Sequence, residues 1–378
     1  MTTHRPAPHA CLTLATLLAA CTGDVDAGPL DDGGENDAGP ADDGGAHDAG
    51  DDAGALLDAG VVDAGALDAG PPPPDFVLHG VPVRFLDDDE ADAFLATSDD
   101  FTEVVSLFDR QIRLRTADTV DDAAFRAHLG EQGRRWGTDE RARYLDALGE
   151  LDGALDGLLL DLPDEIVLVK TSGLDEFQAP YTRRNGIVVP ASFITNGVGQ
   201  ELRLLSHELL HILTRHQPGF RDALYSVFGF VPTNVIAWPA ALEDGRFTNP
   251  DAYTLAHALT VSHQGADVDV MPLYHWPDGL DAALALPGFL SAVDTFLLVV
   301  ADTGDGTYAP VDDDGGVRLL PISETSYAAQ VGANTTYIVH PDEVVASNFE
   351  LVVRKRAGLP WNVPSPDEVL ALEALFLP

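Results

Sequence analysis

Cysteine is almost missing from this chain: its only two, Cys11 and Cys21, both lie near the N-terminus. The rest of the sequence therefore offers no thiol for a disulfide. Its stability must come from an apolar core or from a bound metal.

Basic residues are also scarce, with 21 Lys and Arg against 62 Asp and Glu and a formal net charge of −41. A surface of this sign repels polyanions. Nucleic acid and anionic lipid surfaces are therefore excluded as expected partners.

Long apolar runs are missing after the N-terminus. The best candidate, Leu286 to Val300, is interrupted by Asp294, whereas a membrane-spanning helix needs about 20 predominantly apolar residues. We therefore expect the body of the protein to be soluble.

The N-terminus has the pattern of a secretory signal, with a weakly basic start and a short apolar core from Leu12 to Ala20. Its end, Leu18-Ala19-Ala20-Cys21, resembles the lipobox of bacterial lipoproteins. The resemblance implies that residues 1–20 are a lipoprotein signal peptide and that Cys21 carries a lipid anchor. Thr22 rather than Asp after this cysteine implies a position in the cell envelope at the outer membrane.

Residues 21–75 contain seven Asp-Ala-Gly triplets and no Lys or Arg, and end in a run of four prolines. Low hydrophobicity and charge of one sign predict a disordered acidic linker. A calcium-binding repeat is the alternative interpretation, but the triplets recur at irregular intervals.

The most informative segment is His207-Glu208-Leu209-Leu210-His211, because its two histidines are four residues apart in an apolar helical pattern. This spacing puts both imidazoles on one helix face, where they can bind one metal ion. Glu208 would lie beside the metal and accept a proton from water. The apolar stripe that buries the helix consists of Leu202, Leu205, Leu209 and Leu213.

This motif resembles that of the zincin metallopeptidases, which have uncharged residues around the pentad and a hydrophobic residue where Leu213 stands. The resemblance implies a zincin-like metallopeptidase domain over residues 76–378, zinc as cofactor and a peptide or protein as substrate. It also implies that Gly186 to Pro190, shortly before the motif, is the edge strand that pairs with substrate. A plain buried strand is the alternative. We expect the chain to act as a monomer.

Hydrophobic periodicity predicts an α+β fold for this domain, with a helical N-terminal part. The expected strands, or otherwise buried segments, are 76–86, 165–170, 235–239, 259–263 and 293–301. The expected helices are 98–114, 120–136, 138–160, 219–229 and a short helix from Pro366. Thr248 to Asp251 is expected to be a turn that can contribute to the site.

A catalytic zinc needs a third protein ligand, and three residues are candidates. Glu343 is preferred, because Pro341 predicts the start of a helix. On this helix Val345, Phe349 and Val352 would be buried on one face, and Glu343 and Ser347 would lie on another. Its segment resembles the second zinc helix of gluzincins. Glu243 and His216 are the alternatives, but His216 lacks the preceding glycine turn of sites that use a more distant histidine.

The gluzincin resemblance has one departure. In that family an Asp four residues after the ligand Glu hydrogen-bonds a metal-binding His, and here this position is Ser347. Ser347 or Asn348 would have to orient the imidazole, which predicts weak support for the ligands. Tyr337 and His340 flank Glu343 and are candidates for stabilising an oxyanion.

These residues predict a zinc-dependent peptidase that is tethered to the cell envelope. A non-catalytic binding protein with a zincin fold is the alternative, for which Ser347 is the main support. An envelope protein in which zinc only stabilises the fold is a third interpretation.

Overall fold

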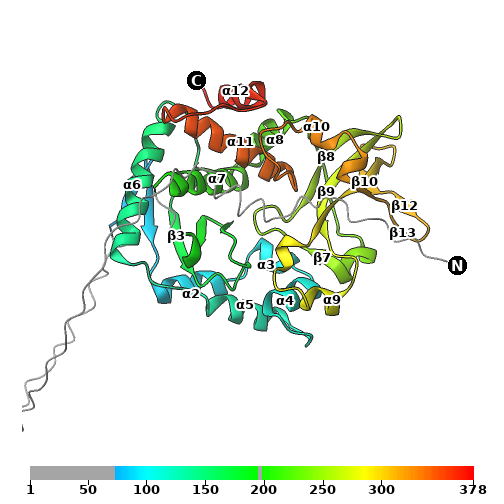
Figure 1. The fold of residues 1–378 in the computed structure, drawn as a ribbon, viewed down its shortest axis with the longest axis horizontal. Helices are drawn as coiled ribbons and strands as arrows, with labels where there is room; N and C mark the ends of the chain where they lie inside the picture. The colour runs from blue at the N-terminus through cyan, green and yellow to red at the C-terminus, as the bar shows by residue number, and fades with distance from the viewer. Residues whose placement is uncertain (1–72, 195–197) are drawn as a thin grey trace, which may run out of the picture. The chain divides into compact units, whose positions relative to one another are not determined.

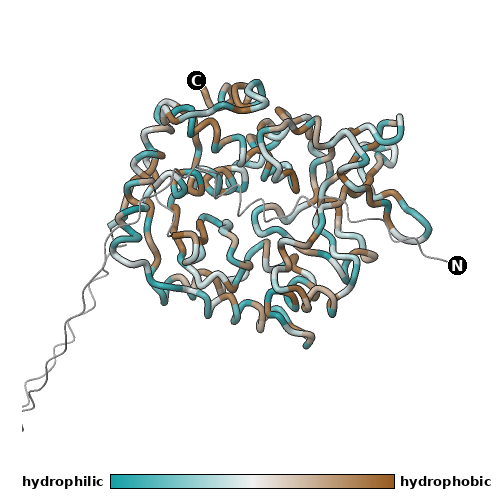
Figure 2. The backbone as a smooth tube through the Cα atoms, viewed as in Figure 1, coloured by the Kyte–Doolittle hydropathy of each residue, from teal (hydrophilic) through white to brown (hydrophobic). Residues whose placement is uncertain are grey.

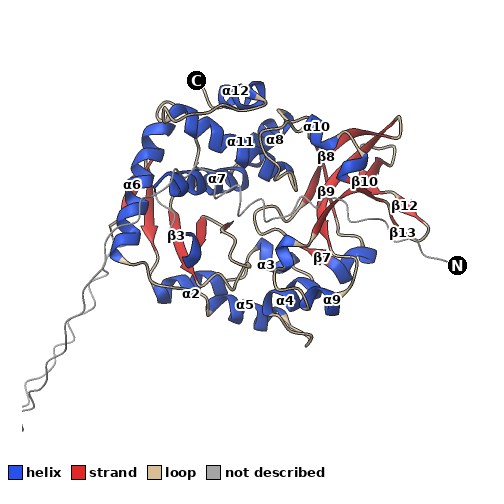
Figure 3. Ribbon diagram, in the orientation of Figure 1, coloured by secondary structure: helices blue, strands red, loops and turns tan. Residues whose placement is uncertain are grey.

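A computed structural model describes residues 73–194 and 198–378. The predicted signal peptide, Cys21 and nearly all of the predicted linker lie outside the described residues. The described chain is a mixed α/β structure with two principal sheets, in agreement with the predicted α+β class (Figure 3).

The first sheet has the order β1-β2-β3-β5-β4, with parallel pairing of β2 with β3 and of β3 with β5 and antiparallel pairing at both ends. Its strands are β1 (Phe76–Leu78), β2 (Val81–Phe85), β3 (Ile166–Thr171), β4 (Tyr181–Arg183) and β5 (Gly186–Pro190).

Strand β3 shows why this sheet lies between two helical layers. Ile166 and Leu168 pack into one core, and Val167 and Val169 into another. Successive side chains of a strand point to opposite faces, so a strand covered on both faces needs a continuous apolar run. The run from Ile166 to Val169 supplies it.

Helices cover both faces of this sheet. The face that receives Val167 is covered by α2 (Asp88–Ala96), α3 (Asp100–Val104) and α5 (Asp122–Gly130). The opposite core contains the helices α6 (Thr138–Leu155), α7 (Val198–His216), α8 (Pro218–Ser226), α11 (Pro341–Arg356) and α12 (Pro366–Leu375). Helix α7 contacts α6 and α11 (Figure 1).

The second sheet is antiparallel, with the order β11-β10-β9-β8-β6; β14 also pairs with β10 and β7 with β9. Its strands are β6 (Val231–Ile236), β7 (Arg246–Phe247), β8 (Leu255–His263), β9 (Ala266–His275), β10 (Asp294–Asp302), β11 (Tyr308–Pro310) and β14 (Leu319–Pro321). Figure 2 shows a hydrophilic loop at the hairpin of β12 (Asp312–Asp313) and β13 (Gly316–Val317). The remaining helices are α4 (Leu107–Leu114), α9 (Leu280–Leu284) and α10 (Tyr327–Gln330), with short 3₁₀ helices at Ala191–Phe193, Ala240–Gly245, Phe289–Ser291 and Ile322–Glu324.

Three strand predictions differ from the structure. Of 235–239, only Val235 and Ile236 lie in a strand, β6. The segment 76–86 is a hairpin rather than one strand, because His79 and Gly80 both adopt positive φ, 49° and 85°, as a two-residue turn requires. Strand β5 is the plain buried strand of the alternative interpretation rather than an edge strand, since it lies between β3 and β4 and all five of its residues are buried. Pro190 lies beyond the part of β5 that pairs with β4, whose register ends at Val188, and is paired only with Thr171 of β3.

The short helix predicted from Pro366 is present as α12, and Ser365 occupies its N-cap position without a side-chain cap hydrogen bond. The Ser365 hydroxyl instead accepts a hydrogen bond from Ala333 N at 3.1 Å. Strand β9 was not predicted. Within the described residues, no helix is both long and apolar enough to cross a membrane.

Candidate metal centre

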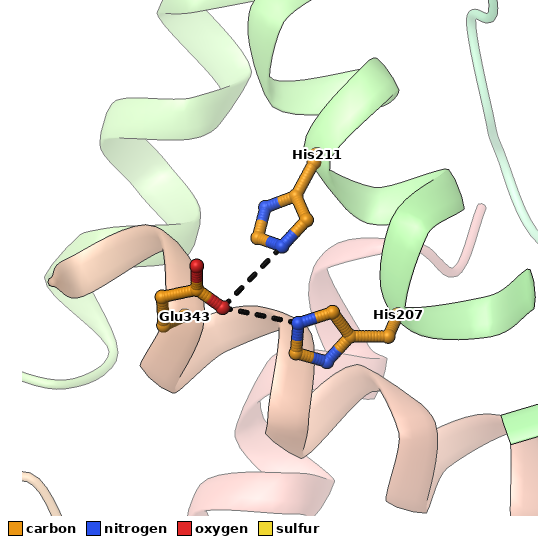
Figure 4. Close-up of side chains that lie close together, drawn as sticks. All are labelled: His207, His211 and Glu343. Carbon is orange, nitrogen blue, oxygen red and sulfur yellow. Dashed lines mark hydrogen bonds and ion pairs between the residues drawn. The ribbon is translucent and has the colours of Figure 1, made fainter. Parts of the chain in front are cut away.

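The two histidines of the motif lie on α7 as the spacing predicts, and Glu343 approaches them from α11 (Figure 4). His207 Nε2 lies 3.0 Å and His211 Nε2 lies 3.4 Å from the same oxygen, Glu343 Oε2. The ligand atoms of all three residues lie within 4.8 Å of one another, and all three are buried. The preferred third ligand is therefore next to the motif, although 136 residues separate it from His207.

Each imidazole is held from behind by a carboxylate. His207 Nδ1 donates to Glu350 Oε1 at 2.7 Å, and His211 Nδ1 donates to Asp342 Oδ2 at 2.7 Å. Such a bond leaves Nε2 facing the metal position and increases the basicity of the ligand. Tyr225 in turn donates to Asp342 Oδ1 at 2.6 Å.

The expectation of weak support for the ligands is therefore wrong. Ser347 does not hold an imidazole, and Asn348 donates instead to Val344 O within α11. Glu350 takes this role because it lies seven residues after Glu343, two helical turns along the same face. The missed signal in the sequence was this spacing, together with the acidic neighbour Asp342.

The turn that connects β7 to β8 also contributes side chains to the centre. Asn249 Nδ2 donates to Glu343 Oε1 at 2.6 Å, and Asn249 Oδ1 accepts from Asp251 N at 3.0 Å. Asp251, Glu208 and His211 also have ligand atoms within 4.8 Å of one another. The turn predicted at Thr248 to Asp251 thus reaches the site, as the sequence suggested.

The donor set fits a divalent metal. Two imidazoles and one carboxylate are a known zinc set that leaves a position for water. Among the described residues, the buried atoms His211 Nε2 and Glu208 Oε2 have no hydrogen-bond partner. Buried polar atoms are normally partnered, so these two indicate that a group belongs between them.

Charge balance supports the same conclusion. Burial raises the pKa of Asp342, Glu343 and Glu350, but the adjoining histidines outweigh burial and lower all three. When both imidazoles are neutral, as metal binding requires, these three negative charges face one positive charge, Arg203, which pairs with Glu350. These side chains alone leave a charge of −2, and Glu208 and Asp251, which also lie at the centre, add carboxylates to it, so the centre favours a cation.

Without a metal, protons bound to the histidines and to Glu208 would neutralise part of this negative charge. Burial alone lowers the pKa of His207, but hydrogen bonds to Glu343 and Glu350 raise it to about 10. Burial and the nearby charge of Asp251 raise the pKa of Glu208 to about 8. Metal and protons therefore compete for the same atoms.

The two residues predicted to stabilise an oxyanion, Tyr337 and His340, differ in their position relative to the centre. Tyr337 lines the same cavity as Glu208 and Glu343. His340 instead caps α11: its Nδ1 accepts from Asp342 N at 3.1 Å, and its Nε2 lies 3.3 Å from Thr254 O. Both ring nitrogens of His340 are thus engaged away from an oxyanion position.

The alternative ligands are not in the centre. Glu243 lies in the 3₁₀ helix Ala240–Gly245, with its side chain 41% exposed and 3.5 Å from Arg246. His216 is the last residue of α7. Neither belongs to a candidate metal group among the described residues.

A cavity extends from the metal centre along α7. It is bounded by charged and aromatic side chains that include Tyr144, Glu201, Arg203, Glu208, Tyr337 and Glu343. A second cavity between α7 and α11 shares Arg203, Ser347 and Glu350 with it. The cavity at the centre has a volume of about 40 Å³ and its neighbour about 470 Å³.

Comparisons with protein-family models, with curated proteins and with solved structures find no match to this chain. The interpretation of the centre therefore depends on its own geometry and chemistry.

Proposed function

We propose that this chain is a zinc-dependent peptidase of the gluzincin type, in which His207, His211 and Glu343 bind the metal. The observation that carries the proposal is the convergence of these three ligands, with a carboxylate 2.7 Å behind each imidazole. The zincin-like fold is part of the proposal. Cys21 lipidation would tether the enzyme to the cell envelope.

Zinc bound here would lower the pKa of a water molecule and polarise the carbonyl of the scissile bond. Glu208 supplies the base, because its Oε2 is buried beside the ligands and has no hydrogen-bond partner among the described residues. Burial and the nearby charge of Asp251 raise the pKa of Glu208, which favours uptake of the proton that it would then pass to the leaving amine.

The other residues of the centre position the three proposed ligands. Asn249 holds the outer oxygen of Glu343, and Asp342 and Glu350 orient the histidines. Tyr337 lines the cavity and is the remaining candidate for donating a hydrogen bond to the oxyanion. His340 supports the centre as the N-cap of α11.

The test is zinc content, measured by elemental analysis of the purified full-length chain, together with peptide hydrolysis. We expect one zinc per chain in the parent protein and in Glu243→Ala, and none in Glu343→Ala. Glu208→Gln should keep the zinc and lose turnover by at least about a hundred-fold, the scale of general-base catalysis. A parent protein without zinc, or loss of zinc from Glu208→Gln, contradicts the proposal.

The alternative of a non-catalytic binding protein loses its main support, because Glu350 supplies the carboxylate that Ser347 lacks. The same assay separates the two functions. A binding protein would retain zinc in the parent protein and hydrolyse no peptide of a broad library.

A further inference from the structure

The cavity beside the metal centre holds more negative charge than the metal position uses. Glu201, Glu208 and Asp251 line it in addition to the ligands. The one arginine that lines it, Arg203, is paired with Glu350. Its walls therefore favour a cationic ligand, and the chain's net charge of −41 favours the approach of cations as well.

Among these carboxylates, Glu201 is buried at a distance from the metal position. It lies seven residues before Glu208 on α7, on the same helix face and about 10 Å along the axis. Its side chain is only 1% exposed; Oε1 accepts from Arg143 Nε at 3.2 Å, whereas Oε2 has no partner among the described residues. A buried carboxylate oxygen without a partner costs stability, so a ligand that satisfies it is a reason for its presence.

Tyr144 provides a second observation on the same wall. It projects from α6, which packs against α7, and its side chain is fully buried. Tyr144 lines the cavity, and among the described residues its hydroxyl has no hydrogen-bond partner. Two buried polar atoms from different helices thus lie unsatisfied at one cavity.

The lining of this cavity also includes apolar side chains. Phe193 and Leu204 line the cavity beside Glu201 and Tyr144. A lysine or arginine side chain combines an apolar stem with a charged end, and packs its stem on apolar surface while the charge finds polar partners.

We propose that Glu201 and Tyr144 form a specificity site for a cationic group of the substrate, a basic side chain or the N-terminal ammonium of a peptide. Glu201 Oε2 and the Tyr144 hydroxyl accept its hydrogen bonds, and Phe193 and Leu204 contact its stem. This inference rests on the proposed peptidase function for the identity of the substrate, but the binding of the cation can be measured without hydrolysis.

The experiment uses hexapeptides in which lysine is placed at each position in turn, each paired with the same peptide carrying norleucine. Every peptide is made with a free and with an acetylated N-terminus, which distinguishes a side chain from the terminal ammonium. Binding is measured by calorimetry in the Glu208→Gln background, and kcat/KM is measured in the parent protein.

Three variants are compared for both readouts. Glu201→Gln removes the charge and keeps a hydrogen-bonding oxygen for Arg143. Tyr144→Phe removes only a hydroxyl that has no hydrogen-bond partner in the described part of the chain, so a purely structural role predicts no change. Glu373→Gln is the matched control, because Glu373 is also buried and ion-paired but lies on α12 outside the cavity.

We expect the cationic peptides to bind roughly ten- to hundred-fold more tightly than their neutral partners, the range of hydrogen bonds to charged groups. Glu201→Gln should abolish this preference, Tyr144→Phe should reduce it, and Glu373→Gln should leave it unchanged. Binding without any preference for a cation, or a preference that survives Glu201→Gln, overturns the inference. Preferred binding without hydrolysis by the parent protein contradicts the peptidase function alone, and hydrolysis without preference contradicts only the inference.

Discussion

Each imidazole of the candidate metal centre has a carboxylate on its far side, and the two carboxylates come from opposite sides of Glu343 in the sequence. Asp342 immediately precedes it, and Glu350 follows it by two helical turns. Helix α11 therefore supplies a ligand and both orienting groups. The centre depends on these individual side chains more than on Ser347.

Replacing Glu350 tests this assignment. Glu350→Gln should weaken zinc binding about ten- to hundred-fold, because the amide holds His207 less strongly and the imidazole becomes less basic. Ser347→Ala should leave zinc affinity unchanged. Affinity is measured by competition with a zinc chelator, and equal losses in the two variants would show that Glu350 does not support the ligand.

His340 predicts a pH dependence of stability. Burial lowers its pKa from 6.5 to about 4, so the folded protein favours the neutral ring. This contribution is complete above pH 6.5 and is lost as the pH falls from 6.5 to 4, by up to about 3 kcal/mol. Asn at this position also caps a helix and does not titrate.

The measurement is the free energy of unfolding of the parent protein and of His340→Asn across this range. The difference between the two should change in favour of the variant as the pH decreases. A constant difference from pH 7 to pH 4 would show that His340 does not titrate in this window.

At the scale of elements, helix α4 supports the turn that carries Asn249 and Asp251. Arg113 is fully buried and donates to Glu176 at 2.8 and 2.9 Å, to Asp109 at 2.7 Å and to Thr248 O at 2.8 Å. Asp109 in turn accepts from the backbone N–H and the hydroxyl of Thr248, both at 2.8 Å. A buried ion cluster therefore anchors this side of the metal centre.

Arg113→Met should destabilise the fold by about 3–5 kcal/mol, because it leaves two buried carboxylates without their partner. It should also weaken zinc binding, since Asn249 follows Thr248 directly and holds Glu343. Arg126→Met, which breaks a partly exposed pair with Asp122, should cost less than about 1 kcal/mol. Denaturant unfolding and zinc titration check both effects, and a zinc affinity unaltered by Arg113→Met would separate the cluster from the centre.

At the scale of the whole molecule, the metal would join α7 in the middle of the chain to α11 near its end. A ligand that binds only the folded state stabilises it by about 4 kcal/mol at a thousand times its dissociation constant. Removing zinc with a chelator should therefore lower Tm by several degrees. Glu343→Ala should melt at one temperature with or without the chelator, and an equal chelator effect on this variant would place the metal elsewhere.

Local pattern determined much of what could be predicted. The apolar period around His207 and His211 predicts their helix and their common face, and Pro341 predicts the start of the helix that carries Glu343. These features depend on residues within a few helical turns of each other. The continuous apolar run of β3 likewise predicts a strand from its own sequence.

Only the tertiary structure decided the rest. The choice of Glu343 over Glu243, the roles of Glu350 and Asn249, and the inner position of β5 all depend on contacts between segments far apart in the chain. Spacing in sequence places residues on a face, but it does not specify which distant face meets it. That pairing is set by how the cores of the two sheets and the α7 and α11 layer pack, which no local periodicity encodes.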